Sequence, residues 1–416
     1  MSHVLGLRCI RCAKEHAEPS ATGALGYVCG GCGGNLEVVY DLAAIRRSVS
    51  PASLKANSDA SVWRYAAFLP GDPGPLASRL AVGGTPLLEA PMLGREVGLG
   101  HLQLKDDTRL PSASFKDRAS AVALVHAHAR GERVVAGAST GNAASSTACL
   151  AARSGMRTLI FLPENAPRAK VAQILLYGAQ VVAVRGTYDQ AFDLCLAACA
   201  KHGWYNRNTG HNPWTREGKK TCAFEIAEQR GWRVPDWVFV PVGDGNILSG
   251  VWKGFVELHQ AGFTDRVPRL AAVQAERSNA IQLAFEGDGE LRPVSGETIA
   301  DSISVGLPRD GHAAVRALHE SNGIAVLVSD EDILAGMRLA ARTEGVFAEP
   351  AAAASIAGAA RAVRDGRVRS HESVVALVTG NGLKDVNSAM RAAGTPTLID
   401  PDLGSFERLL SERIRL

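Results

Sequence analysis

The chain has 416 residues, a length that accommodates two or three domains and a large buried core. With 46% hydrophobic residues, few aromatics and 43 glycines, it fits a loop-rich α/β enzyme better than a fibrous or disordered protein. The net charge of only +3, with the two signs interspersed, argues against a nucleic-acid or membrane partner. No apolar run reaches transmembrane length and the first residues lack the layout of a signal peptide, so we expect a cytoplasmic protein.

The first chemical signal is a pair of Cys-x-x-Cys motifs near the N-terminus. Cys9 and Cys12 form one pair and Cys29 and Cys32 the other, with about sixteen residues between the pairs. This spacing matches a four-thiolate zinc ribbon, and a redox disulfide pair or a ribbon that no longer binds metal would share it. Few basic or aromatic residues surround the motifs, which favours a structural zinc cap. The remaining cysteines lie in apolar, helix-like segments and are expected to be buried thiols: Cys149, Cys195, Cys199 and Cys222.

Residues 41–84 are predicted to form a linker and an edge element, with an amphipathic stretch at 42–48. From there strands and helices alternate, which indicates parallel βαβ units. The expected strands are 101–106, 133–138, 158–162, 180–184, 237–241, 269–274 and 374–378. The expected helices are 119–130, 166–177, 188–202, 218–230, 251–261, 330–344 and 351–362, with a short helix within 396–416.

One stretch after the strand at 101–106 combines small residues with a lysine. It reads Leu-Pro-Ser-Ala-Ser-Phe-Lys-Asp-Arg and places Lys116 at the start of a predicted helix. Small side chains let a planar cofactor approach, and a helix N-terminus favours its anionic groups. Lys116 therefore fits a Schiff-base lysine, with a solvated helix-starting lysine as the alternative interpretation.

Three further loops follow predicted strands, at the sheet edge where open α/β proteins bind ligands. Residues 243–246 have the form of a phosphate-binding loop, or of a plain strand–helix turn. Residues 139–142 offer hydroxyls and an amide that suit a carboxylate and a phenolic oxygen, or an ordinary helix cap. Thr379 ends the last strand, where its hydroxyl would meet a heterocyclic nitrogen or belong to a simple turn.

Taken in chain order, these segments resemble the threonine synthase family of fold-type-II pyridoxal-phosphate enzymes. The resemblance covers about residues 7–390 and includes the cysteine ribbon that many such chains carry. The matching segments are 111–118, 139–142, 241–250 with 252–255, 344–350 and 379–385. The resemblance implies a fold like that of the tryptophan synthase β subunit: two three-layer α/β domains with open, twisted, mostly parallel sheets, plus a small zinc-ribbon-like segment. The implied boundaries are 1–45 for the ribbon, 46–115 and 226–416 for the large cofactor domain, and 116–225 for the small domain.

The resemblance also implies roles for individual residues. Lys116 would form an aldimine with pyridoxal 5'-phosphate and later move protons. Asn142 would contact the ring oxygen, and Thr379 would face the ring nitrogen, where a neutral hydroxyl suits elimination and replacement at the β or γ carbon. The implied cofactor-phosphate contacts are Gly243, Asp244, Gly245, Asn246 and Ile247. The implied substrate contacts are Ser139, Thr140 and Gly141 for the carboxylate and Arg216 for a phosphate.

The reaction implied by the resemblance converts O-phospho-L-homoserine and water to L-threonine and phosphate, in a homodimer. Three features depart from the family pattern: Ser112-Ala113 replaces Thr-Gly, Ala119 replaces Gly, and Arg216 is displaced by one position, with Arg309 as a substitute anion contact. The alternative is β-elimination or β-replacement on serine, threonine or O-phosphoserine, as in a dehydratase or cysteate synthase. A zinc-ribbon binding protein on a catalytically silent scaffold is an alternative from another class, against which Lys116, the phosphate loop and Thr379 all argue.

Overall fold

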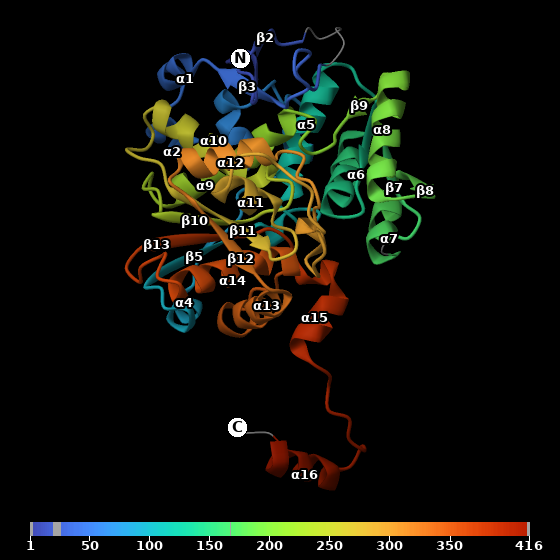
Figure 1. Cartoon of the computed structure of the whole chain (residues 1–416), viewed down its shortest axis with the longest axis vertical. Helices are drawn as coiled ribbons and strands as arrows, with labels where there is room; N and C mark the ends of the chain where they lie inside the picture. The colour runs from blue at the N-terminus through green and yellow to red at the C-terminus, as the bar shows by residue number, and fades with distance from the viewer. Residues whose placement is uncertain (1–2, 20–25, 167, 414–416) are drawn as a thin grey trace.

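Three sheets organise the chain, which a computed structural model describes over residues 3–19, 26–166 and 168–413 (Figure 1). The first contains β1 (Val4–Cys9), β2 (Glu15–His16) and β3 (Leu36–Tyr40), in the antiparallel order β2-β1-β3. It lies at the N-terminal end of the molecule, at the top of Figure 1. Residues 1–2 and 20–25 of the predicted ribbon lie outside the described part, as do residue 167 of a predicted helix and residues 414–416 of the tail.

The second sheet forms the centre of the larger unit. Its strands are β4 (Leu87–Glu89), β5 (His101–Asp106), β10 (Trp237–Pro241), β11 (Arg269–Ala275), β12 (Ile324–Val328) and β13 (Ser373–Val378). They run in the order β12-β11-β10-β13-β5-β4, all parallel except β4, which pairs antiparallel with β5 at one edge. Strand β10 is buried along its whole length, as a continuous apolar run in a parallel sheet predicts.

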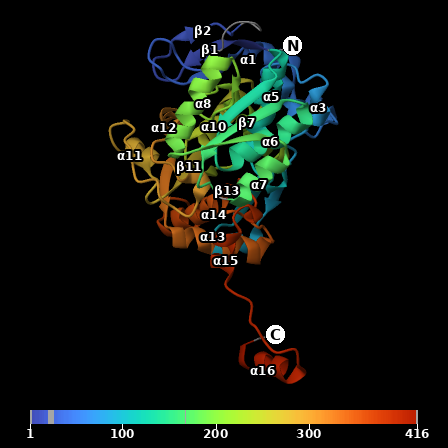
Figure 2. The same cartoon turned by 90° about the vertical axis from the view of Figure 1, so that its right-hand side faces the viewer.

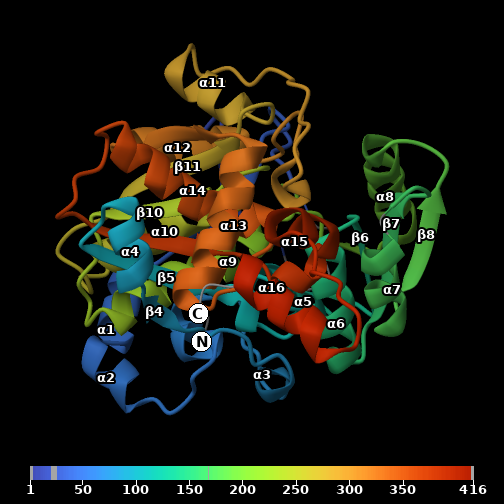
Figure 3. The ribbon, with the colours of Figure 1, turned by 90° about the horizontal axis from the view of Figure 1, so that it is seen from below.

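Helices cover both faces of this six-stranded sheet, because side chains alternate along each strand. The helices are α4 (Pro91–Val97), α9 (Trp214–Gln229), α10 (Asn246–Gln260), α11 (Ala280–Glu286), α12 (Gly311–Glu320), α13 (Asp330–Glu344) and α14 (Pro350–Arg364). Val238 and Val240 of β10 pack with α9, α10 and α12. Trp237 and Phe239 pack on the opposite face with α4, α13 and α14, the layer that Figure 3 views from below.

The third sheet belongs to the smaller unit, seen at the front of Figure 2. Its strands are β6 (Val134–Ala138), β7 (Arg157–Pro163), β8 (Gln180–Val184) and β9 (Tyr205–Asn206), in the parallel order β8-β7-β6-β9. Helices α6 (Asn142–Ser154) and α7 (Arg168–Leu176) cover one face and α8 (Tyr188–His202) the other. The thiols of this unit and of α9 are free and buried, as expected: Cys149, Cys195, Cys199 and Cys222.

Helix α5 (Lys116–Ala129) joins the two units through an unusually close helix crossing. A Cβ atom on Gly218 of α9 would lie 1.9 Å from the Arg118 carbonyl oxygen of α5, so only glycine allows the two backbones to approach this far. Gly254 of α10 is likewise required, since its Cβ would lie 2.4 Å from the Lys220 carbonyl oxygen. Helices α5, α9 and α10 therefore form one stack, and the boundary predicted between residues 225 and 226 falls inside the continuous helix α9.

The C-terminal part extends away from this body. After α15 (Val386–Ala393), an extended segment leads to α16 (Leu403–Arg413), which Figures 1 and 2 show apart from the two α/β units. The arm exposes large apolar side chains, with Leu398 96% and Leu403 69% exposed. In the described part, none of the helices has the length and apolar character required to cross a membrane. The region predicted as a linker holds α1 (Leu42–Ser48), α2 (Pro51–Ala56), η1 (Val62–Phe68) and α3 (Leu76–Arg79).

Candidate active site and metal centre

A cavity of about 560 Å³ lies between the two α/β units. The loops after β6, β10 and β13 open into it at the carboxyl ends of these strands, where ligands bind in open α/β folds. The residues predicted from sequence that line the cavity are Lys116, Ser139, Thr140, Gly141, Asn142, Gly243, Asp244, Gly245, Asn246, Ile247 and Thr379. The fold thus brings together every predicted cofactor residue and the predicted carboxylate loop.

Lys116 begins α5, and its amine makes no hydrogen bond to any residue that the structure describes. Burial lowers the pKa of Lys116, and the neighbouring Arg207 lowers it further. The preceding turn is held by Asp117, whose carboxylate accepts from the Ser112 backbone N–H at 2.6 Å and from its hydroxyl at 2.5 Å. Ala113 adopts φ 60°, a left-handed conformation that disfavours alanine by roughly 1 kcal/mol relative to the glycine of the family pattern.

Thr379 and Lys116 are tied to each other through the backbone. The Phe115 N–H donates to the Thr379 carbonyl oxygen at 2.9 Å, and an isolated antiparallel bridge joins Ser114 to Gly380. Gly380 is required here, because a Cβ would lie 2.2 Å from a Glu349 carboxylate oxygen. The end of β13 and the start of α5 are therefore one rigid piece of the cavity wall.

Asn142 opens α6 and faces across the cavity to the large unit. Its side-chain amide donates to Glu349 at 2.7 Å and to Ser302 at 3.2 Å. Burial raises the pKa of Glu349, which favours its protonated form. In the loop before Asn142, the Gly141 N–H donates to the Ser139 hydroxyl at 3.1 Å.

The phosphate-type loop is shaped by its glycines. Gly245 has φ +88°, and a Cβ on Gly243 would lie 2.9 Å from the Ile303 Cα, so both positions require glycine. Asn246 then begins the 15-residue helix α10, whose N-terminus points at the cavity. Asp244 accepts from the Arg309 backbone N–H at 3.1 Å, and burial raises the pKa of its carboxyl. The Arg309 backbone N–H therefore gives the Asp244 carboxyl a hydrogen-bond partner within a loop that is predicted to bind phosphate.

Arg216 is not brought to the cavity. It is 2% exposed, donates to Asp310 at 2.6 Å and to the Leu36 carbonyl oxygen at 3.1 Å, and does not line the cavity wall. Arg309 does line the cavity, but its guanidinium is paired with Asp189 at 2.5 Å. Arg216 instead contacts β3 of the N-terminal sheet through the Leu36 carbonyl oxygen.

Two buried cationic residues of the cavity wall, Arg207 and Lys219, were not predicted from the sequence. Arg207 is 2% exposed and donates to the hydroxyls of Ser120 at 3.0 Å and Thr209 at 3.0 Å, with no carboxylate within ion-pair distance among the described residues. Lys219 is fully buried on α9. Arg207 follows β9, a strand of two residues that is too short for a periodicity signal, and Lys219 resembles an ordinary helix-surface lysine.

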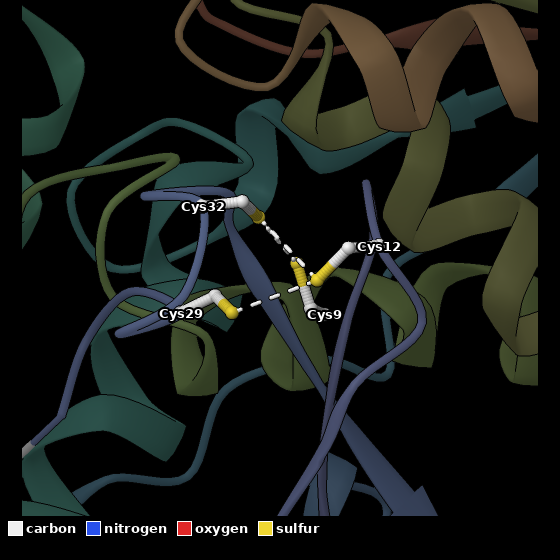
Figure 4. A group of neighbouring side chains, drawn as sticks. All are labelled: Cys9, Cys12, Cys29 and Cys32. Atoms are coloured by element: carbon white, nitrogen blue, oxygen red, sulfur yellow. Dashed lines mark hydrogen bonds between the residues drawn. The ribbon is translucent and has the colours of Figure 1, made fainter.

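The four ribbon cysteines converge at the N-terminal end of the molecule (Figure 4). Their sulfur atoms lie within 4.8 Å of one another, with Cys9–Cys32 and Cys12–Cys32 at 3.4 Å and Cys12–Cys29 at 3.7 Å. Tetrahedral zinc with sulfur ligands at about 2.3 Å requires sulfur–sulfur separations of roughly 3.8 Å, so the cluster fits zinc. The backbone N–H groups of Gly31 and Cys32 lower the pKa of Cys29 to about 6, which favours the thiolate that a metal binds.

The ribbon is attached to the phosphate loop through Asn35. Its side-chain amide donates to the Arg309 carbonyl oxygen at 2.7 Å and to Asp310 at 3.0 Å. Asp310 also accepts from Asn246 of the phosphate loop at 2.7 Å. The ribbon is thus connected to the cavity wall through the Asp310 carboxylate and through Arg309, whose backbone N–H donates to Asp244.

Comparison with known proteins agrees with this geometry. The family described as pyridoxal-phosphate dependent enzyme matches residues 78–380. Among solved structures, threonine deaminase isoform 2 of Solanum lycopersicum superposes with a TM-score of 0.65 at 23% identity, covering 81% of this chain and 93% of that one. Diaminopropionate ammonia lyase of Escherichia coli gives 0.66 at 18% identity, covering 78% and 94%. These similarities and the cavity define a fold-type-II pyridoxal-phosphate enzyme, which confirms the predicted fold and cofactor.

Curated relatives narrow the family. A threonine synthase of Methanocaldococcus jannaschii is 38% identical over 408 residues, 97% of this chain and 99% of that protein. A threonine synthase of Mycobacterium tuberculosis is 40% identical over 325 residues, 77% and 88% of the two chains. The chain belongs to the threonine synthase family.

Proposed function

We propose that this chain converts O-phospho-L-homoserine and water to L-threonine and phosphate. The proposal rests on two side chains that line the same cavity. Lys116 has a free amine, and Arg207 has a buried guanidinium with no carboxylate partner among the described residues. A buried cation of this kind is stabilised by an anionic ligand. A phosphorylated amino acid supplies a phosphate dianion in addition to its α-carboxylate, whereas serine and threonine carry the carboxylate alone.

The side chains of the cavity divide the work of the proposed reaction. Bound pyridoxal phosphate supplies the electron withdrawal that acidifies the substrate α carbon. Lys116, with its lowered pKa, has a neutral fraction that accepts the α proton and then a β proton. Lys116 releases the α proton before it takes the β proton, and the γ C–O bond breaks as phosphate leaves toward Arg207. The γ carbon takes up a proton to become the methyl group, and water adds its hydroxyl at the β carbon. The α carbon regains a proton, and the proton left from water goes to the phosphate. Arg207 stabilises the charge of the departing phosphate.

The remaining assignments follow from position in the cavity wall. We assign the cofactor phosphate to residues 243–247, the ring oxygen to Asn142 and the ring nitrogen to Thr379, since each faces the cavity from a strand end or a helix start. Ser139, Thr140 and Gly141 precede the N-terminus of the 13-residue helix α6, which favours the substrate carboxylate.

The substrate assignment predicts a specific pattern of product release. Incubation with O-phospho-L-homoserine should release phosphate and threonine in equal amounts, and O-phosphoserine and threonine should yield little ammonia or 2-oxo acid. Arg207→Gln should raise the KM for O-phosphohomoserine about 100-fold, because a charge-assisted hydrogen bond to a buried group is lost. Arg185→Gln, at a 93% exposed side chain, is the control. Ammonia and 2-oxo acid as the main products would favour the β-elimination alternative instead.

We further propose that Cys9, Cys12, Cys29 and Cys32 hold one structural zinc ion. Elemental analysis of the purified chain should find about one zinc per chain. Cys29→Ser should abolish it and lower the melting temperature by roughly 5 °C, since the ribbon packs on the body through Asn35. Cys149→Ala, at a buried thiol of the small unit, should leave the zinc content unchanged. A disulfide among the four cysteines in the protein purified without reductant would contradict the assignment.

We also propose that the protein is a cytoplasmic homodimer. The cysteines of the described chain are all free, which suits the reducing cytoplasm. A homodimer would cover apolar side chains that the C-terminal arm exposes, among them Leu398 and Phe406. The expected small-molecule partner is the amino-acid substrate.

A further inference from the structure

Lys219 and Lys220 are consecutive, fully buried lysines of α9 with opposite surroundings. Lys220 forms ion pairs with Glu217 at 2.6 Å and Glu257 at 2.7 Å. Lys219 has no carboxylate within ion-pair distance among the described residues, and its amine donates only to the Asn246 side-chain oxygen. The charge of Lys220 is therefore neutralised by carboxylates of the protein. The charge of Lys219 has no such partner in the described part of the chain and is available to a bound anion.

The acids nearest to Lys219 are already engaged. Asp310 accepts from Arg216 at 2.6 Å, from Ser249 at 2.7 Å and from Asn246 at 2.7 Å. Asp244 accepts from a backbone N–H at 3.1 Å and retains a raised pKa through burial. Neither carboxylate is placed to pair with the Lys219 amine.

The surroundings of Lys219 disfavour the charged form of its amine. Burial removes its hydration, and the charges of Lys116 and Arg207 act in the same direction, so that the pKa of Lys219 lies well below its usual value. An ammonium group buried without a counter-charge costs several kcal/mol. The side chain is nonetheless fixed in the cavity wall, because α9 and α10 touch where a Cβ on Gly250 would lie 2.9 Å from the Lys219 Cβ.

The partner atom of Lys219 identifies the ligand. Asn246 is the first residue of α10, so the Lys219 amine lies at the N-terminus that follows the glycine loop. Backbone N–H groups of such a loop and a buried ammonium are both complementary to a dianionic phosphate. We propose that Lys219 is the counter-charge of the cofactor phosphate, so that the cofactor is held by a full charge in addition to the loop amides. This inference rests on the assignment of the cofactor phosphate to residues 243–247.

The proposal is tested by measuring cofactor binding instead of turnover. In the full chain stripped of cofactor and titrated by absorbance, Lys219→Gln should raise the dissociation constant of pyridoxal phosphate about 100-fold, the loss expected for a buried charge-assisted hydrogen bond. Pyridoxal, which lacks the phosphate, should bind both proteins equally. Lys219→Arg should recover part of the affinity, and Lys55→Gln on the exposed part of α2 should have no effect.

Thermal unfolding separates this role from a purely structural one. Without cofactor, Lys219→Gln should melt at the same temperature as the parent or higher, because a buried unpaired cation is removed. With cofactor, the variant should melt lower. Equal loss of stability in both states would overturn the proposal, as would an unchanged dissociation constant for pyridoxal phosphate. An unchanged constant with a raised KM for the phosphorylated substrate would assign the charge to the substrate phosphate. If the protein did not turn over O-phosphohomoserine, the results on pyridoxal-phosphate binding would still hold. The experiments therefore distinguish the role of Lys219 from the substrate assignment.

Discussion

Lys116→Ala is expected to lose activity by about 10⁴-fold or more, the largest effect of any single substitution in the cavity. In the proposed mechanism, the variant removes both the amine that links the cofactor and the base that moves the α proton. Its fold should be retained, because the amine makes no hydrogen bond to a described residue. Steady-state turnover of O-phosphohomoserine gives the rate, and unfolding temperature checks the fold.

Borohydride reduction followed by peptide mass analysis gives an independent result. In the parent protein the cofactor should be recovered covalently on the peptide that contains Lys116, and in Lys116→Ala no peptide should carry it. Lys55→Ala, on the surface helix α2, should behave as the parent. Cofactor recovered on another lysine, or turnover preserved in Lys116→Ala, would show that the assignment is wrong.

Arg118→Ala is expected to lower the free energy of unfolding by about 3–5 kcal/mol. Arg118 is fully buried and donates to Asp107 at 2.6 Å and to Glu225 at 2.7 Å, while Lys105 also pairs with Glu225 at 2.7 Å. Two buried cations thus neutralise two buried carboxylates. Removal of one arginine leaves two carboxylates with a single counter-charge, inside the stack that positions α5.

Denaturant unfolding of Arg118→Ala and of Arg109→Ala measures the contrast. Arg109 pairs with Asp106, but its side chain is 69% exposed, so its loss should cost about 1 kcal/mol or less. Burial would raise the pKa of Glu225, but Arg118 and Lys105 overcome this and hold it well below its usual value. A depressed carboxyl pKa stabilises the fold above the unfolded value of about 4.3, so the Arg118 contribution should persist at neutral pH and decline under acid. A difference below 1 kcal/mol between the two variants would contradict this account.

The strands of the fold and the loops that follow them could be predicted, because short runs of consecutive residues indicate them. The predicted strands 180–184 and 237–241 coincide with β8 and β10, since both contain a continuous apolar run. Only β10 is buried along its length, whereas β8 is an edge strand with exposed and half-buried residues. The loops that follow strands were predicted for the same reason, and parallel topology alone brings their ends to one edge. Residues 139–142 and 243–246 therefore meet in the cavity although a long stretch of chain separates them.

The charged residues of the cavity depend on contacts that no local pattern encodes. Glu349 lies in a segment that resembles the family, yet its contact with Asn142 requires the two units to be placed first. Lys219 and Lys220 are adjacent in sequence and equally buried, and only the tertiary structure shows which one is paired. The position of Arg216 outside the cavity wall was likewise not predictable, because its ion-pair partner Asp310 is distant in the chain.

The attachment of the ribbon through Asn35 joins the proposed zinc site to the proposed phosphate site by a chain of hydrogen bonds. Asn35 follows Cys32 by a single tight turn and donates to Asp310, the carboxylate that also orients Asn246 at the start of α10. A rearrangement of the Cys32 turn that moves Asn35 would remove one hydrogen-bond donor from Asp310, which also accepts from Asn246. If the four cysteines hold zinc and residues 243–247 hold a phosphate, thermodynamic linkage requires that any effect of one site on the affinity of the other be reciprocal. The N-terminal sheet therefore helps to position Asn246, a residue of the cavity wall, through Asn35 and Asp310.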